Sequence, residues 1–338
     1  MIIQHRNGTY PIEFLRLDQV GLDPNSPIIT DSNLAKLYPN FLNGFQHPWV
    51  IPAGEASKSL GVFGECLEWL VKIGAHRKTE IIAFGGGVVG DLVGFVAATF
   101  MRGIRYIQVP TSLLAQVDSS VGGKVGIDLE GGKNLAGAFH PPSKVLVCAE
   151  LLQTLPERQL INGAAEVWKY GAIMDLDLLA TLRAQPIQAQ QNLTPIIQRC
   201  IELKAQVVQE DEFETTGRRA ILNFGHTIGH AIEKVLHYDT LLHGEAISIG
   251  MVLEAELGEN LGITEPGTAR LLREDLARQG LPITLPAGLQ APEILLAMQS
   301  DKKSLGQGLS FSFLTSLGTC KLVHGVEQEH VLSVLKHS

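Results

Sequence analysis

The sequence predicts an α/β domain with a parallel sheet, followed by a mostly α-helical domain. Short apolar runs alternate with helical patterns as far as about residue 150, and beyond it most patterns have the period of a helix. Strands that alternate with helices are typical of a parallel sheet covered by helices. A chain of 338 residues also exceeds what one hydrophobic core usually supports, which favours two domains, 1–150 and 151–338.

The first domain is expected to contain strands, which are short apolar runs bounded by turn residues. They are predicted at 27–31, 48–51, 80–84, 105–109 and 144–147, and the first two of them are expected to be buried. Helices are predicted at 59–74, where apolar residues recur with a helical period, and at 88–100. Residues 118–140 are rich in glycine and show little periodicity, so we expect a long irregular segment with a functional role.

The second domain is punctuated by proline and glycine, which separate helical patterns. Helices are predicted at 156–173, 195–210, 223–236, 245–261, 266–279 and 292–300. The alternating stretches 309–313 and 319–324 predict a short hairpin, and a terminal helix follows.

Charge, hydrophobic patterning and cysteine usage limit the partners and the cellular location expected for the chain. The net charge of −8 argues against nucleic acid and anionic membranes, which require a basic surface. The sequence contains no run of about eighteen apolar residues, the length that a membrane-spanning helix requires. The N-terminal residues lack the apolar core of a signal peptide. Four widely spaced cysteines without a CxxC pair fit a reduced chain, so we expect a cytoplasmic protein.

Histidines recur between residues 223 and 243. His226 and His230 are four residues apart and lie on one helical face, and His243 begins the next helical pattern. Imidazole is the commonest metal ligand. The pair could be two ligands, or one ligand and one acid or base, and either ring could be a buried structural histidine. The best carboxylate candidate for Zn²⁺ is Glu166, which could instead lie on a solvated face or form an internal salt bridge with Lys169 at i+3.

Three glycines, Gly85–Gly87, follow a predicted strand and open a predicted helix. Such a turn brings backbone N–H groups close to a diphosphate, and the start of a helix favours anions. The spacing differs from GxGxxG, so a tight turn between strand and helix is the alternative to nucleotide binding.

Cationic and amide side chains recur on glycine-rich or apolar segments. They would suit a substrate with two anionic groups, such as a phosphate and a carboxylate, although a solvated loop is the alternative reading of the glycine-rich part. These residues are Lys124, Lys133, Asn134, Lys169, Lys204, Arg219 and Lys302.

Together these segments closely resemble the 3-dehydroquinate synthase family. The resemblance extends from about residue 55 to residue 303, in the order of the family. The matching strings are GGGVVGD at 85–91, PTSLLAQVDSSVGGK at 110–124, GKN at 132–134, AEVWKYG at 165–171, Arg219 with LNFGHTIGHA at 222–231, HGE at 243–245 and DKK at 301–303.

The resemblance implies a Rossmann-like first domain, a helical second domain and an active site in the cleft between them. It implies a Zn²⁺ (or Co²⁺) site made by Glu166, His226 and His243, and it assigns His230 to the substrate. Implied NAD-binding residues are Asp31, Glu55, Lys58, Gly86, Gly87, Val88, Asp91, Thr111, Ser112, Lys133 and Asn134. Implied catalytic and substrate-binding residues are Asp118, Lys124, Lys169, Lys204, Arg219, Asn223, His230 and Lys302, and Arg102 is expected to reach the site of a second subunit in a homodimer.

The family's reaction converts 3-deoxy-D-arabino-heptulosonate 7-phosphate to 3-dehydroquinate and phosphate. By resemblance, it proceeds through transient oxidation by NAD, phosphate elimination, re-reduction and intramolecular aldol closure. One alternative is another sugar phosphate cyclase, whose substrate lacks the carboxylate that Arg219 and Asn223 favour. A second is a metal-dependent polyol dehydrogenase, which would release NADH, and a third is a non-catalytic relative.

Overall fold

The structure is a computed structural model that describes residues 1–6, 8–301 and 308–336, with only the backbone of residues 300 and 301. The chain divides into two compact units. The first comprises Met1–Pro156 and Asn192–Ala205, and the second comprises Glu157–Gln191 and Gln206–Ser338. The division therefore passes through helix α7 (Thr194–Glu210), which a single boundary near residue 150 does not anticipate.

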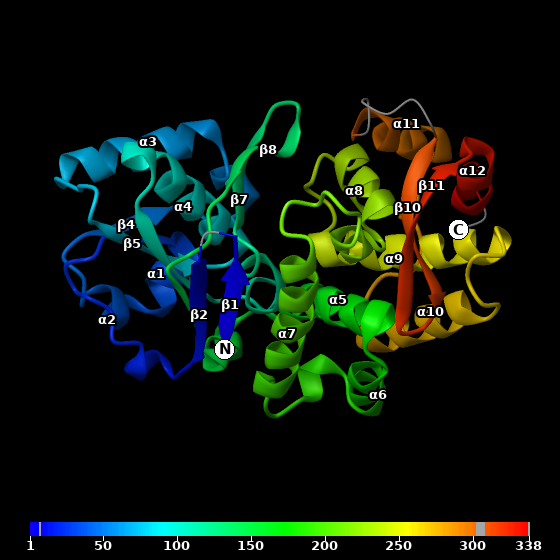
Figure 1. Cartoon of the computed structure of the whole chain (residues 1–338), viewed down its shortest axis with the longest axis horizontal. Helices are drawn as coiled ribbons and strands as arrows, with labels where there is room; N and C mark the ends of the chain where they lie inside the picture. Colours follow the sequence, from blue (N-terminus) through cyan, green and yellow to red (C-terminus); the bar gives the residue numbers. More distant parts are fainter. Residues whose placement is uncertain (7, 302–307, 337–338) are drawn as a thin grey trace. The chain divides into compact units, whose positions relative to one another are not determined.

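A sheet of seven strands, counted over the described residues, forms the first unit (Figure 1). Its order is β1-β2-β9-β6-β5-β3-β4; β1 and β2 are antiparallel, and all other pairs are parallel. The strands predicted in this sheet are confirmed, but the one at 48–51, expected to be buried, lies at the edge of the sheet with Pro48 and Val50 exposed. The N-terminal pair was not predicted. The bounds are β1 Ile2–His5, β2 Gly8–Phe14, β3 Ile28–Asp31, β4 Pro48–Ile51, β5 Glu80–Gly85, β6 Arg105–Pro110 and β9 Lys144–Val147.

Helices cover both faces of this sheet. Side chains alternate between the two faces along each strand, and apolar residues on both faces need to be buried. On β5, Ile81 and Ala83 pack in one hydrophobic cluster with helices α3 (Leu60–Lys72) and α4 (Gly87–Thr99). Ile82 and Phe84 belong to a second cluster with α1 (Ser32–Leu37), α2 (Pro39–Leu42) and the 3-10 helix η5 (Ala149–Thr154). The predicted α/β class is confirmed.

The segment 118–140, expected to be irregular, instead contains an antiparallel hairpin of β7 (Lys124–Leu129) and β8 (Gly132–Phe139). Gly126 pairs with Gly137. A Cβ on Gly126 would lie 2.7 Å from the carbonyl oxygen of Ala136, and one on Gly137 would lie 2.5 Å from that of Val125. Glycine permits this close strand approach, and the same glycines hide the alternation that would have predicted strands.

Helices dominate the second unit (Figure 1). The predicted hairpin appears as β10 (Leu309–Ser316) and β11 (Thr319–Val326), followed by α12 (Gln328–Lys336). The remaining helices are α5 Glu157–Met174, α6 Leu176–Ala184, α8 His226–Val235, α9 His243–Asn260, α10 Thr268–Gln279 and α11 Ala291–Asp301, with the short 3-10 helices η6 Ile187–Ala189 and η7 Arg219–Asn223.

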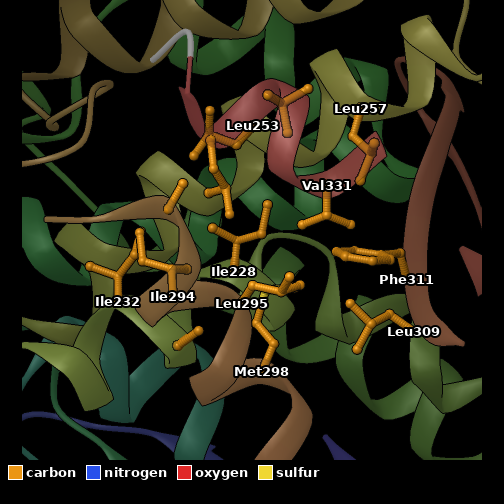
Figure 2. Packing of buried hydrophobic residues seen from close by; sticks show 14 of the residues in the cluster. Ile228, Ile232, Leu253, Leu257, Ile294, Leu295, Met298, Leu309, Phe311 and Val331 are labelled. Atoms are coloured by element: carbon orange, nitrogen blue, oxygen red, sulfur yellow. The ribbon is translucent and has the colours of Figure 1, made fainter. Parts of the chain in front are cut away.

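One hydrophobic core holds α8, α9, α11, α12 and β10 together (Figure 2). It includes Ile228 of α8, Leu253 of α9, Ile294 of α11 and Phe311 of β10, all completely buried. Helix α8 begins three residues later than predicted, because Gly225 has a left-handed backbone (φ 81°) that interrupts the helical path.

Across the described residues, no helix is both long enough and apolar enough to cross a membrane.

Candidate active site and metal centre

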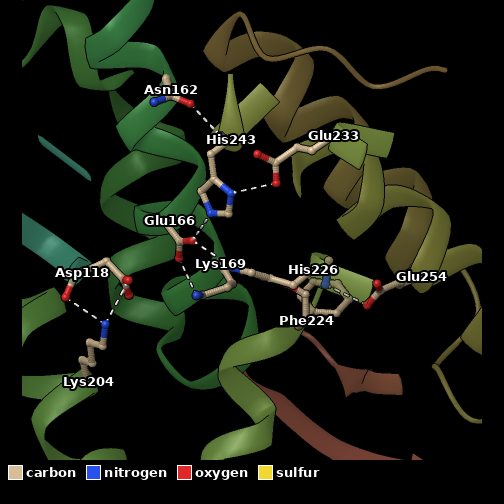
Figure 3. Close-up of polar contacts among 12 residues, drawn as sticks. Asp118, Asn162, Glu166, Lys169, Lys204, Phe224, His226, Glu233, His243 and Glu254 are labelled. Carbon is tan, nitrogen blue, oxygen red and sulfur yellow. Dashed lines mark hydrogen bonds and ion pairs between the residues drawn. The ribbon is translucent and has the colours of Figure 1, made fainter. Parts of the chain in front are cut away.

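Three potential metal ligands meet in the second unit (Figure 3). Glu166 Oε1 lies 3.2 Å from His226 Nε2 and 3.3 Å from His243 Nε2. Ligand atoms about 2.1 Å from a tetrahedral Zn²⁺ lie roughly 3.4 Å apart. One carboxylate and two imidazoles at this spacing therefore fit a divalent cation with nitrogen and oxygen ligands.

Helix α5 brings Glu166 and α9 together. Asn162 and Glu166 are four residues apart on α5, so both side chains lie on one face. Asn162 Oδ1 accepts a hydrogen bond of 2.5 Å from Gly244 N in the first turn of α9, and Glu166 meets His243 at the same turn. A Cβ on Gly244 would overlap with the carbonyl oxygen of Asn162, so glycine is needed for this approach. The packing of α5 against α9 thus sets the position of His243.

The electrostatics of these donors are strongly coupled. Burial would raise the pKa of Glu166, but Lys169, His226 and His243 outweigh it and hold the pKa well below its usual range. Burial, with the charge of Lys169, lowers the pKa of His226. Burial also opposes the charged form of His243, but hydrogen bonds to Glu166 and Glu233 raise its pKa to about 10. The site thus favours an ionised carboxylate, with cationic charge beside it.

His226 and His230, which spacing alone pairs, belong to different groups of donors. His226 joins Glu166 and His243, whereas His230 forms a second group with Glu233 and His243. The His230 ring is exposed, and its centroid lies 5.2 Å from that of His226. Its place beside the first group suits a role in contact with a bound molecule.

Lys169 lies next to the donors and is almost completely buried. Its Nζ forms an ion pair with Glu166 Oε2, an oxygen that makes no hydrogen bond to any residue described in the structure. The i, i+3 salt bridge anticipated from the sequence therefore exists, and it coexists with the donor cluster on the other oxygen, Oε1.

Arg219 and Asn223 begin and end η7, directly before α8. The loop that precedes η7 is held by Asp211, whose carboxylate accepts backbone hydrogen bonds from Thr215, Thr216 and Arg219. Burial would raise the pKa of Asp211, but these hydrogen bonds lower it to about 2. Arg219 Nη1 in turn donates to the carbonyl oxygen of Glu212 at 2.6 Å.

In the first unit, several of the predicted NAD-binding residues lie at the carboxyl ends of β3, β5 and β6. Asp31 ends β3, Gly86 follows β5 and Thr111 follows β6, and these three strands are neighbours in the sheet. Ligands of parallel α/β sheets bind at this edge. Gly86 is the N-cap of α4, Gly87 and Val88 form its first turn, and Ser112 Oγ would lie 3.3 Å from a Cβ on Gly86.

Charged residues form a network beside this edge. Lys58 Nζ is 2.8 Å from Asp91 Oδ2 on α4 and 4.0 Å from Glu55 Oε1. Lys133 Nζ lies 3.7 Å from the same Glu55 oxygen. Burial would lower the pKa of Lys58, but Asp91 and Glu55 outweigh it and raise the pKa. Asn134, the neighbour of Lys133 on β8, adopts φ 56° and donates its backbone N–H to Asp128 at 2.8 Å.

Asp118 and Lys204 also meet in the first unit (Figure 3). Lys204 Nζ lies 2.9 Å from Asp118 Oδ2 and donates to the Asp118 carbonyl oxygen at 2.8 Å. Asp118 belongs to the π-helical turn η4 (Ala115–Ser119), a rare geometry that is frequent at functional sites. Lys124 is exposed at the start of β7, Arg102 is exposed with φ 70°, and Lys302 lies outside the described residues.

Three supporting residues were missed at the sequence level: Asn162, Glu233 and Glu254. Glu233 follows His226 by seven residues on α8, which places both on one helical face, so periodicity could have identified it. Asn162 and Glu254 act on the first turns of other helices through the backbone. No sequence spacing signals such a contact.

Two family models match the chain. The model of the 3-dehydroquinate synthase N-terminal domain matches residues 48–162, and that of the 3-dehydroquinate synthase C-terminal domain matches residues 163–304. The chain is 43% identical over 356 residues to the 3-dehydroquinate synthase of Caldanaerobacter subterraneus subsp. tengcongensis, covering 99% of each chain. It is 46% identical over 295 residues to that of Xanthomonas oryzae pv. oryzae, covering 85% of this chain and 80% of the relative.

Solved structures of sugar phosphate cyclases share the fold. One is 2-deoxy-scyllo-inosose synthase complexed with carbaglucose-6-phosphate, NAD⁺ and Co²⁺ (TM-score 0.89, 25% identity, covering 100% of this chain and 99% of that one). Another is 2-epi-5-epi-valiolone synthase from Streptomyces hygroscopicus with NAD⁺ and Zn²⁺ bound (TM-score 0.90, 25% identity, covering 100% and 98%). A probable glycerol dehydrogenase from Sinorhizobium meliloti shares the fold at 14% identity (TM-score 0.63, covering 97% of this chain and 95% of that one). From its motifs, its fold and its near full-length relatives, the chain belongs to the 3-dehydroquinate synthase family.

Proposed function

We propose that this protein is a 3-dehydroquinate synthase, which converts 3-deoxy-D-arabino-heptulosonate 7-phosphate to 3-dehydroquinate and phosphate. The observation that carries the proposal is the meeting of Glu166, His226 and His243, beside the buried Lys169, in a chain of this family. Such a set would combine a divalent ion, which stabilises developing negative charge, with a lysine placed to bind an anionic group.

The proposed cofactors are NAD and a divalent ion, Zn²⁺ or Co²⁺. The two cyclase structures that share the fold contain NAD⁺ with one of these ions. Glu166, His226 and His243 would hold the ion, and the edge around Asp31, Gly86 and Thr111 would hold the dinucleotide, with the start of α4 facing its diphosphate. When bound, NAD supplies reversible hydride transfer and the ion acts as a Lewis acid toward substrate hydroxyl groups.

The chain's own residues would bind and orient the two anionic ends of the substrate. Arg219 and Asn223 are proposed to hold the carboxylate, since a planar guanidinium pairs with a carboxylate through two hydrogen bonds. The lysines 124, 169, 204 and 302 are proposed to hold the phosphate and hydroxyl groups, with Asp118 paired to Lys204. A substrate fixed at both ends reacts with a smaller entropic barrier.

His230 is proposed to move hydroxyl protons. Its ring is exposed beside the proposed metal ligands, and a neutral imidazole near physiological pH can both accept and donate a proton. We further propose a cytoplasmic homodimer in which Arg102 reaches the site of the second subunit, with the NAD-binding domain at 1–150 and the substrate-binding domain at 151–338.

A phosphate-release assay tests the reaction. Purified protein with catalytic NAD and Zn²⁺ should release phosphate from 3-deoxy-D-arabino-heptulosonate 7-phosphate, but not from sedoheptulose 7-phosphate or glucose 6-phosphate. Preference for either of the last two would assign the protein to another cyclase activity. Accumulation of NADH in proportion to product would instead indicate a polyol dehydrogenase and contradict the proposal.

Two matched substitutions test the ligand assignment. Glu166→Gln should lower the bound metal content, because a neutral amide replaces the anionic ligand, whereas His230→Ala should retain the metal and lose rate. Metal content measured by elemental analysis, beside phosphate release, separates the two effects. Equal loss of metal in both variants would show that the ligands are wrongly assigned.

A further inference from the structure

We infer that Glu233 is a positioning residue, which holds the ring of His243 so that Nε2 is its metal-binding atom. The inference rests on the metal site proposed above. Glu233 is a carboxylate on α8 with 2% of its surface exposed. A buried carboxylate is costly unless it is paired, so its interactions in this place need an explanation.

The His243 ring lies between two carboxylates (Figure 3). Its Nδ1 lies 3.2 Å from Glu233 Oε2, and its Nε2 lies 3.3 Å from Glu166 Oε1. A neutral imidazole carries one N–H, and the nitrogen without it offers the lone pair to a metal. Without a metal, a protonated ring can donate to both carboxylates; with an ion in place of the Nε2 proton, Nδ1–H would still donate to Glu233 and the Nε2 lone pair would face the ion beside Glu166.

His226 shows the same arrangement with a different acceptor. Its Nδ1 lies 3.2 Å from the carbonyl oxygen of Phe224, and its Nε2 lies 3.2 Å from Glu166 Oε1. Both rings therefore turn Nε2 toward one carboxylate oxygen and Nδ1 toward a separate oxygen acceptor. The hydrogen bond on the second nitrogen of a ligand histidine sets its tautomer and orientation. For His226 the backbone supplies that bond, and for His243 we assign it to Glu233.

Glu233 also belongs to the other donor group, with His230 and His243. If this group held its own metal ion through Nδ1 of His243 while Nε2 bound an ion beside Glu166, the ring would have to lose both N–H protons. A neutral ring supplies only one lone pair. The geometry therefore favours one ion on the Nε2 side and a hydrogen bond to Glu233 on the Nδ1 side.

The test measures metal affinity by competition with a chromogenic chelator, using the full chain and Zn²⁺ alone. Glu233→Leu removes the acceptor and should weaken Zn²⁺ binding about 10–100-fold, the range found for such supporting residues. Glu233→Gln keeps a weaker, neutral acceptor, so its dissociation constant should lie between those of the wild type and Glu233→Leu. The visible absorption of the Co²⁺-loaded protein should change in the same order, because the ring shifts relative to the ion.

Asp275→Asn is the matched control. Asp275 is a buried carboxylate on α10 that pairs with Arg183 at 2.7 Å, and α10 provides none of the proposed metal ligands. It should lose stability and keep its metal affinity. If Glu233→Leu does not fold, Glu233→Gln decides: an unchanged dissociation constant and Co²⁺ spectrum would overturn the inference. A wild type that binds no Zn²⁺ would instead refute the proposed metal site itself.

Discussion

Glu254, in the middle of α9, accepts the backbone N–H of Gly225, the N-cap residue directly before α8, with 2.7 Å between Oε2 and the nitrogen. Its other oxygen, Oε1, accepts the N–H of Ile228 at 3.0 Å. Glycine has no side chain to cap a helix, so a fully buried carboxylate from the neighbouring helix satisfies two N–H groups at this terminus. His226 is the first residue of the helix held in this way.

Glu254→Leu should therefore destabilise the protein. Two buried N–H groups would lose a charged acceptor, and each such loss costs about 1–3 kcal/mol. Urea unfolding should show a free energy of unfolding lower by about 3 kcal/mol, with a smaller loss in Glu254→Gln, which keeps one acceptor oxygen. A Leu variant as stable as the wild type would mean that water or other groups satisfy these N–H groups.

Gly250→Ala should disturb the same helix contact. A Cβ on Gly250 would overlap with the carbonyl oxygen of Gly225 and lie 2.9 Å from Gly229 N, and neither backbone atom can move without shifting α8. We expect a loss of stability of about 1–3 kcal/mol from this overpacking, together with weaker metal binding through His226.

Gly64→Ala is the control for Gly250→Ala. Gly64 lies within α3, and a Cβ there would meet no atom within 4 Å. Because alanine favours helices over glycine by up to about 1 kcal/mol, this variant should be slightly more stable. Thermal unfolding of both variants separates crowding at Gly250 from a general effect of the substitution.

Asp211 should contribute a pH-dependent part of the stability. Its pKa falls from the ordinary 3.8 to about 2 in the folded chain. A lowered carboxylate pKa stabilises the fold above the unfolded value, and this contribution is lost as the pH falls through the folded value. The difference in free energy of unfolding between the wild type and Asp211→Ala should therefore be constant above pH 5 and shrink between about pH 4 and pH 2. A difference that does not shrink in this range would show that Asp211 acts through packing and not through its charge.

The ion pair of Lys204 with Asp118 should couple these residues in the proposed reaction. Lys204→Met removes the cation 2.9 Å from the Asp118 carboxylate, and Asp118→Asn removes the negative charge that faces Lys204. Each variant should lower kcat/KM by at least about tenfold, and the double variant should lose less than the product, with a coupling energy of about 1–3 kcal/mol. Lys36→Met, on the exposed part of α1, provides a control for the loss of a lysine. Additive effects would show that the two residues act independently.

Much of the first unit followed from local patterns. The strands at 48–51 and 144–147 appear with their predicted bounds, because short apolar runs between turn residues favour strands. The edge position of β4, which leaves Pro48 and Val50 exposed, was not predicted, because strand order is a tertiary property. The hairpin of β7 and β8 was not predicted, since glycines at paired positions remove the alternation of side chains. The late start of α8 was not predicted either, because the left-handed backbone of Gly225 is stabilised by Glu254 from another helix.

For the candidate site too, local sequence patterns predicted one part and the tertiary structure decided the rest. The residue types and the histidine spacing on α8 were sufficient to predict a metal site, because donor chemistry and helical periodicity are local properties. They left open which histidines act together. Glu166 and His243 are 77 residues apart and meet through the packing of α5 against α9, which places Glu166 in one donor group with His226 and His243 and not with His230. Hydrogen bonds depend on distance and direction, and for residues so far apart in the chain only the packing of the helices sets both.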